Sequence, residues 1–184
     1  MVDRLGWDYF RRDPVAFINQ SIELLQIAIQ LSPNNSSVSE HFKELAAYAQ
    51  THKDQISGNS WYFLCVVGGL RCPANVMTAC EKLVEIEPEP GRFTGIRGIA
   101  KALTNDIPGA VKDFEANLKW LGSNSARSQF TQESLGKIKQ HRTEWIKALR
   151  SGKNPLLSLK PEEVGAMSQI IEKKTKYNIG EAIE

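Results

Sequence analysis

The residues with the greatest capacity for chemistry in this chain of 184 residues are its three cysteines and three histidines. They are Cys65, Cys72, Cys80, His41, His52 and His141. The cysteine spacing, C-x6-C-x7-C, matches none of the usual zinc patterns, and the histidines lie in different segments. We therefore predict no metal site. Cys65 and Cys80 fall on apolar faces, so we interpret them as small buried hydrophobic residues.

Motifs for catalysis or nucleotide binding are absent from the sequence. Neither G-x-x-x-x-G-K-[ST] nor G-x-G-x-x-G occurs, and there is no nucleophile elbow. His141 stands one turn before Trp145 on the same predicted face, and we interpret it as a packed or capping residue. Glu85, Glu87 and Glu89 gather at a helix end and turn, where solvation accounts for them. These observations predict a protein that is not an enzyme and needs no cofactor.

Composition is that of an ordinary globular domain, with 41% hydrophobic and 24% charged residues. A net charge of only +2 argues against non-specific nucleic-acid binding. No apolar run approaches the roughly 18 residues that a membrane-spanning helix needs. The odd number of cysteines and the beginning MVDRLGWDYF, which is unlike a signal peptide, predict a cytoplasmic, reducing location.

Apolar residues recur at helical spacing along most of the chain. In the segment 14–31, Asp13 is a predicted N-cap and Pro14 the first helical residue. The apolar face of this segment consists of Val15, Ile18, Ile22, Leu25 and Ile29. Further helices are predicted at 39–50, 73–86, 94–103, 108–121, 135–149 and 161–174. The run 61–70 is ambiguous by itself, but since no convincing strand occurs elsewhere, we assign it to a helix as well.

Three residues of the segment 91–121 have a characteristic spacing. Gly98 lies in the middle of one predicted helix, Ala110 is expected to face it from the next, and Phe114 follows one turn later. Together with Trp61, Leu64 and Pro88 in the preceding segment, this pattern resembles the tetratricopeptide repeat (TPR). The resemblance implies an all-α fold in which antiparallel helix pairs stack as a short TPR-like α-solenoid with an extra C-terminal helix.

Residues 59–155 would form the TPR-like core, 1–58 an N-terminal degenerate repeat or cap, and 156–184 a C-terminal tail helix. The core is similar to repeat segments appended to cyanobacterial multidomain signalling proteins, through VMTACEKLVEIEPE, GIRGIAKALTNDIPGAVKDFE and WIKALRSGKNP. It departs from the repeat where Cys65 replaces the usual glycine, and where Val76 and Cys80 replace alanine and an aromatic residue.

Members of this family bind protein ligands on the surface formed by the first helix of each pair. Transferred through the repeat register, the resemblance implies a groove lined by Trp7, Phe10, Asn59, Tyr62, Phe63, Val66, Arg92, Ile96 and Ile99. Such a groove would accept an apolar peptide or an amphipathic helix of another protein, with Arg92 pairing to an acidic group. The alternative is that these aromatic residues pack beneath the helix 39–50 or the tail helix and leave no groove.

The main hypothesis is therefore a non-catalytic adaptor or scaffold that binds another protein, of unknown identity, away from membranes. A second hypothesis is a structural homo-oligomer assembled through the tail helix. Its seam would consist of Val164, Met167, Ile170 and Ile171. A third hypothesis, less favoured by the low net charge, is binding of nucleic acid by the basic stretch 127–153.

Overall fold

The computed structural model describes residues 13–31, 36–160 and 163–164, and these residues form helices and turns with no strand among them. The prediction of an all-α fold is thereby confirmed. The elements are α2 (Pro14–Leu31), α3 (Ser36–Thr51), α4 (Gly58–Phe63), the π-helical turn η1 (Leu64–Gly68), α5 (Gly69–Arg71), α6 (Pro73–Ile86), α7 (Thr94–Leu103), α8 (Ile107–Leu121), α9 (Asn124–Gln129), α10 (Gln132–Arg150) and the 3-10 turn η2 (Pro155–Ser158).

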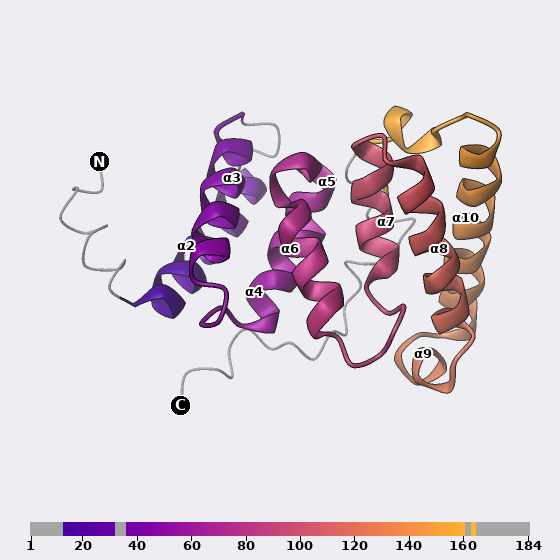
Figure 1. Ribbon diagram of the computed structural model, residues 1–184, viewed down its shortest axis with the longest axis horizontal. Helices are drawn as coiled ribbons and strands as arrows, with labels where there is room; N and C mark the ends of the chain where they lie inside the picture. Colours follow the sequence, from indigo (N-terminus) through magenta and orange to yellow (C-terminus); the bar gives the residue numbers. More distant parts are fainter. Residues whose placement is uncertain (1–12, 32–35, 161–162, 165–184) are drawn as a thin grey trace.

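The helices lie side by side in a row, with α2 and α3 at one end and α8 and α10 at the other (Figure 1). Helix α6 contacts α3, α4 and η1 on one side and α7 on the other, and α7 in turn packs along α8. The short α9 connects α8 to α10 at one end of the row (Figure 1). Within the described residues, no helix is long and apolar enough to cross a membrane.

Helix boundaries follow the turn and cap residues of the sequence. The side chain of Asp13 accepts hydrogen bonds from the backbone N–H groups of Val15 and Ala16, at 3.0 and 3.1 Å, and caps α2 as predicted. Asp106 caps α8 in the same manner through Gly109. The boundaries predicted for α2, α6 and α7 are confirmed. Helix α3 begins earlier than predicted, and α9 was not predicted at all.

The segment 61–70 is helical, as predicted, but it is not a regular α-helix. Ser57 caps α4 by accepting from the backbone N–H of Ser60, and the π-turn η1 follows at Leu64–Gly68. A π-turn inserts an extra residue per turn and turns the face that the helix presents to its neighbours. Apolar periodicity does not reveal such a turn, because the whole run is apolar.

The core runs through the whole row. One buried cluster joins α2, α3, α4, η1 and α6 to one side of α7, a second joins α7, α8, α10 and η2, and a third lies where α8, α9 and α10 meet. Val15 was predicted on the buried face of α2 but is 41% exposed, whereas Ile18, Ile22 and Leu25 are buried. Trp7, Phe10, the side chain of Ile29 and nearly all of the predicted tail helix lie outside the described residues.

Most of the positions that resemble the tetratricopeptide repeat lie in this core. Trp61, Leu64, Ala110 and Phe114 are at most 1% exposed, whereas Pro88 is exposed. Gly98 was expected to face Ala110, but the atoms nearest to it belong to Phe114 and Asp113. A Cβ on Gly98 would lie 2.8 Å from two carbons of the Phe114 ring. The glycine therefore makes room for the aromatic ring rather than for the small residue.

Candidate partner-binding surface

Four of the residues predicted to line a groove are buried. They are Phe63, Val66, Ile96 and Ile99, each between 1% and 7% exposed. The ring of Phe63 stacks on Phe42 of α3 at a centroid distance of 5.8 Å, so α3 covers this part of α4. This is the packing that the alternative hypothesis described. Trp7 and Phe10 lie outside the described residues.

The remaining predicted residues, Asn59, Tyr62 and Arg92, are half-buried. The Tyr62 ring meets the edge of the Phe93 ring at a centroid distance of 5.5 Å. The guanidinium of Arg92 lies over the same Phe93 ring, 4.9 Å from its centroid. Tyr62 belongs to α4 and Arg92 to the turn before α7. Phe93 therefore lies where the helix pair formed by α4, η1 and α6 meets the helix pair formed by α7 and α8. We call Tyr62, Arg92 and Phe93 the aromatic junction.

Acidic side chains stabilise the turn that carries the junction. Glu87 lies 3.5 Å from the Arg92 guanidinium, and its side chain is only 7% exposed. Glu89 accepts hydrogen bonds from Trp120 Nε1 at 2.7 Å and from Ser125 Oγ at 2.8 Å. These bonds lower the pKa of Glu89, because they favour its charged form. The interpretation of these acids as merely solvated is therefore wrong for Glu87, which pairs with Arg92 inside the turn, and for Glu89, which connects the turn to α8 and α9.

Asn117 of α8 holds the same turn from its other side. Its Nδ2 donates to the carbonyl oxygens of Gly91 and Arg92, at 3.0 and 3.2 Å. Its Oδ1 accepts a 3.3 Å hydrogen bond from Arg142 Nε of α10. Backbone carbonyls at the junction are thus bonded through one buried amide to two further helices. This network gives the junction a fixed backbone.

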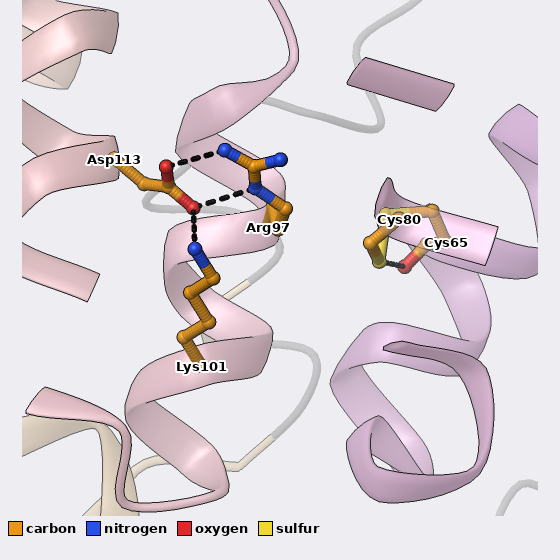
Figure 2. The surroundings of a disulfide bond; sticks show 5 residues. All are labelled: Cys65, Cys80, Arg97, Lys101 and Asp113. Carbon is orange, nitrogen blue, oxygen red and sulfur yellow. Dashed lines mark hydrogen bonds and ion pairs between the residues drawn. A yellow bond between two sulfur atoms is a disulfide. The ribbon is translucent and has the colours of Figure 1, made fainter. Parts of the chain in front are cut away.

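A cluster of charges lies between α7 and α8. The carboxylate of Asp113, whose side chain is 3% exposed, accepts from Arg97 Nε at 2.8 Å and Nη2 at 2.7 Å, and Lys101 Nζ lies 2.9 Å away (Figure 2). The hydrogen bonds with Asp113 raise the pKa of Arg97. Both cations come from successive turns of α7 and converge on one carboxylate, which fixes the rotation of α7 against α8.

Arg142 of α10 is a second deeply buried charge, at 2% exposure. Its guanidinium lies 4.7 Å from the Trp145 ring centroid and 5.1 Å from that of Phe114. Nη1 has no hydrogen-bond partner, and burial lowers the pKa of Arg142 to about 9. The neighbouring His141 stacks on Trp145, in agreement with its interpretation as a packed residue.

Cys65 and Cys80 form a disulfide between η1 and α6, and neither residue is exposed. The predicted burial of both residues is confirmed, but the bond between them was not predicted, because neither spacing nor apolarity shows that antiparallel helices bring two positions together. The Cα atoms lie 4.6 Å apart. The free thiol, Cys72, is also buried, and desolvation raises its pKa to about 11.

In the two alternative binding surfaces, the basic stretch and the tail-helix seam, some of the predicted residues are buried or paired with acidic side chains. In the basic stretch 127–153, Arg142 is buried, Lys137 pairs with Glu133 and Arg150 pairs with Glu115. In the proposed seam of the tail helix, Val164 is 1% exposed and belongs to the core cluster of α7, α8 and α10. The other seam residues lie outside the described part of the chain.

No protein-family model, curated protein or solved structure matches this chain. The candidate surface consequently depends on the geometry alone. Sequence reasoning missed Phe93, the residue that joins Tyr62 to Arg92, although its position next to Arg92 was a usable signal. It also missed Asn117 and Glu89, whose partners are 25 or more residues away in the sequence.

Proposed function

We propose that this chain is a non-catalytic protein-binding module of the TPR-like type, in which stacked helix pairs form a short α-solenoid. The observation that carries the proposal is the aromatic junction. It combines a half-buried tyrosine and a half-buried arginine on a common buried ring, where two helix pairs meet. Tyrosine and arginine are enriched among the residues that contribute most to protein interfaces.

The physical character of the junction suits a peptide or a helix with an apolar side and one acidic residue. Tyr62 offers an apolar ring that has little conformational entropy to lose, and Arg92 offers hydrogen-bond donors to a carboxylate. Glu87 neutralises Arg92 at 3.5 Å, a distance at which a partner's carboxylate can compete for the same guanidinium. Because Asn117 and Glu89 fix the turn, binding requires little ordering of the backbone.

A peptide library displayed on phage, selected against the full chain, tests this proposal. Peptides with aromatic or aliphatic residues beside an acid should be enriched. Tyr62→Ala and Arg92→Ala should each weaken binding of a selected peptide by about tenfold, which corresponds to about 1.4 kcal/mol. Matched controls are Leu157→Ala, a 64% exposed apolar residue on η2, and Lys153→Ala, an exposed cation after α10, which should leave the affinity unchanged.

Denaturant unfolding of the same variants completes the design. Near wild-type stability of Tyr62→Ala with weakened binding supports the proposal. Equal affinities for all variants would place the binding surface elsewhere, and a large loss of unfolding free energy would assign Tyr62 to the core.

A further inference from the structure

The disulfide occupies the place that glycine and phenylalanine occupy in the neighbouring helix pair. In the second pair, Gly98 of α7 lies against the Phe114 ring of α8. In the first pair, Cys65 of η1 is bonded to Cys80 of α6. The same crossing is therefore filled by an aromatic ring in one pair and by two sulfur atoms in the other. Two unbonded side chains would be enough to fill the crossing. The covalent bond between the two cysteines is therefore a feature that packing alone does not require.

The separation of the two helices does not depend on the disulfide. Gly68 of η1 approaches α6 so closely that a Cβ at this position would lie 2.9 Å from Val76 Cγ1 and 3.0 Å from Phe42 Cδ1. This contact, one turn from Cys65, sets the distance between η1 and α6 by packing. The cysteines consequently remain neighbours when the bond is absent, and the bond can re-form without a search.

The surroundings of the sulfur atoms also accommodate two thiols. Cys80 Sγ lies 3.7 Å from the carbonyl oxygen of Cys65, within reach of a thiol hydrogen bond. Gly69 lies beside Cys80 without a side chain, and the position of its absent Cβ is 3.7 Å from Cys80 Sγ. A sulfur atom released from the bond therefore has an acceptor and an open side toward which to move. After reduction, the buried Cys80 thiol can therefore donate to this carbonyl oxygen.

We propose that Cys65 and Cys80 form a reversible redox pair: the oxidised pair prevents local opening of η1 from α6, and the reduced pair permits it while packing keeps the two segments together. A low-molecular-weight disulfide of the glutathione class is the oxidant. One cysteine thiolate attacks it and forms a mixed disulfide with release of one glutathione thiol. The second thiolate then attacks the mixed disulfide and displaces the other glutathione as a thiol. In total, two protein thiols and one glutathione disulfide give one protein disulfide and two glutathione thiols.

The third cysteine, Cys72, lies outside the disulfide and is a free thiol. Burial raises the pKa of Cys72 to about 11, so this thiol stays protonated and is a poor nucleophile near neutral pH. Because Cys65 and Cys80 are 0% exposed, exchange must proceed from a local opening of η1 away from α6. The inference goes beyond the proposed binding function and does not depend on it.

The test is a redox titration of the full chain. Samples are equilibrated in glutathione buffers that span the poise of the cytosol and that of the secretory compartments, then unfolded in acid and alkylated in denaturant. Intact mass counts the alkylated thiols. We expect the count to change from three to one as the fraction of oxidised glutathione rises, with a transition inside the range tested.

Two further variants make the outcome unambiguous. Cys72→Ser should change from two labels to none at the same midpoint, and Cys65→Ser should retain two labels in every buffer. A count that stays at one across all buffers for the wild type would show a permanent structural disulfide and overturn the proposal. A count that stays at three would overturn it as well, because the pair would then never form under these conditions.

Discussion

The two helix pairs at the centre of the row solve the same packing problem with different chemistry. The pair formed by α4, η1 and α6 is held by a disulfide within an apolar core. The pair formed by α7 and α8 is held by a glycine against an aromatic ring and by two cations on one carboxylate (Figure 2). The first pair can therefore respond to the redox environment, whereas the second depends on shape and charge.

The largest effect should follow from removal of the aromatic ring of the second pair. Phe114 is 0% exposed and packs against Trp145 at a centroid distance of 5.6 Å. Phe114→Ala leaves a cavity and should lower the free energy of unfolding by about 4 kcal/mol. Urea denaturation followed by tryptophan fluorescence measures the loss. Phe130→Ala, at a partly exposed ring, is the matched control with a smaller expected loss.

Substitution of Gly98, which lies against the Phe114 ring, tests whether the two residues are energetically coupled. In the wild-type background, Gly98→Ala forces a Cβ to within 2.8 Å of the ring and should cost about 1 to 3 kcal/mol. In the Phe114→Ala background the ring is absent, and the same substitution should gain up to about 1 kcal/mol, because alanine is the better helix former. Equal effects in the two backgrounds would show that the glycine and the ring are not coupled.

Removal of the disulfide should have the next largest effect, and only on the first pair. Cys65→Ala with Cys80→Ala opens a loop of 15 residues and should cost about 3 kcal/mol. Native-state hydrogen exchange should then show faster exchange in α4, η1 and α6 than in α7 and α8. In a reducing buffer the wild type should approach the double variant. Equally faster hydrogen exchange in both pairs would show that the disulfide does not act on the first pair alone.

The charge cluster of the second pair should contribute somewhat less. Asp113→Asn removes the carboxylate from Arg97 and Lys101, which remain one-fifth exposed, and should cost about 2 kcal/mol. Glu115→Gln on the same helix is the matched control. Its pair with Arg150 is largely exposed, so that loss should stay below about 1 kcal/mol. Similar losses for the two variants in thermal unfolding would show that burial adds nothing to the Asp113 cluster.

The sequence was sufficient to predict most of the helices, because proline, cap residues and apolar spacing mark their ends, but α9 was not predicted. Pro73–Ile86 and Thr94–Leu103 have their predicted bounds. The contacts between helices were much harder to predict. Gly98 contacts Phe114 rather than Ala110, and the Cys65–Cys80 bond joins positions whose apolar surroundings indicated only burial. Such contacts depend on helix rotation, and the π-turn at Leu64–Gly68 changes that rotation without a signal in the sequence.

The candidate surface was predicted only in part for a similar reason. The repeat register identified Tyr62 and Arg92, which contact a common ring, yet it also selected Phe63 and Val66, which α3 and the core bury. Register gives the face of one helix and does not show what a neighbouring segment covers. Arg142 illustrates the opposite error, since a helix rich in lysine and arginine is expected to be solvated, but this arginine is buried against two aromatic rings.

The smallest expected effect is at Arg142, where the pair formed by α7 and α8 meets α10. Its substitution should increase the free energy of unfolding, whereas the substitutions above should decrease it in the wild-type background. Arg142→Met gives up the 3.3 Å hydrogen bond to Asn117 Oδ1, but it removes a buried cation whose Nη1 has no partner and still fills the space beside Phe114 and Trp145. The net result should be a rise in the free energy of unfolding of about 1 kcal/mol at pH 7. Lys147→Met, at an exposed position of α10, should leave it nearly unchanged.

The pH dependence distinguishes burial of charge from altered packing. Burial lowers the pKa of Arg142 from its ordinary, much higher value to about 9, so above about pH 9 the unfolded chain binds more protons than the folded one. Wild-type stability should therefore rise with pH above about 9, relative to Arg142→Met, and the advantage of the variant should shrink between pH 7 and pH 10. A constant difference in urea midpoints across this range would mean that methionine acts through packing alone.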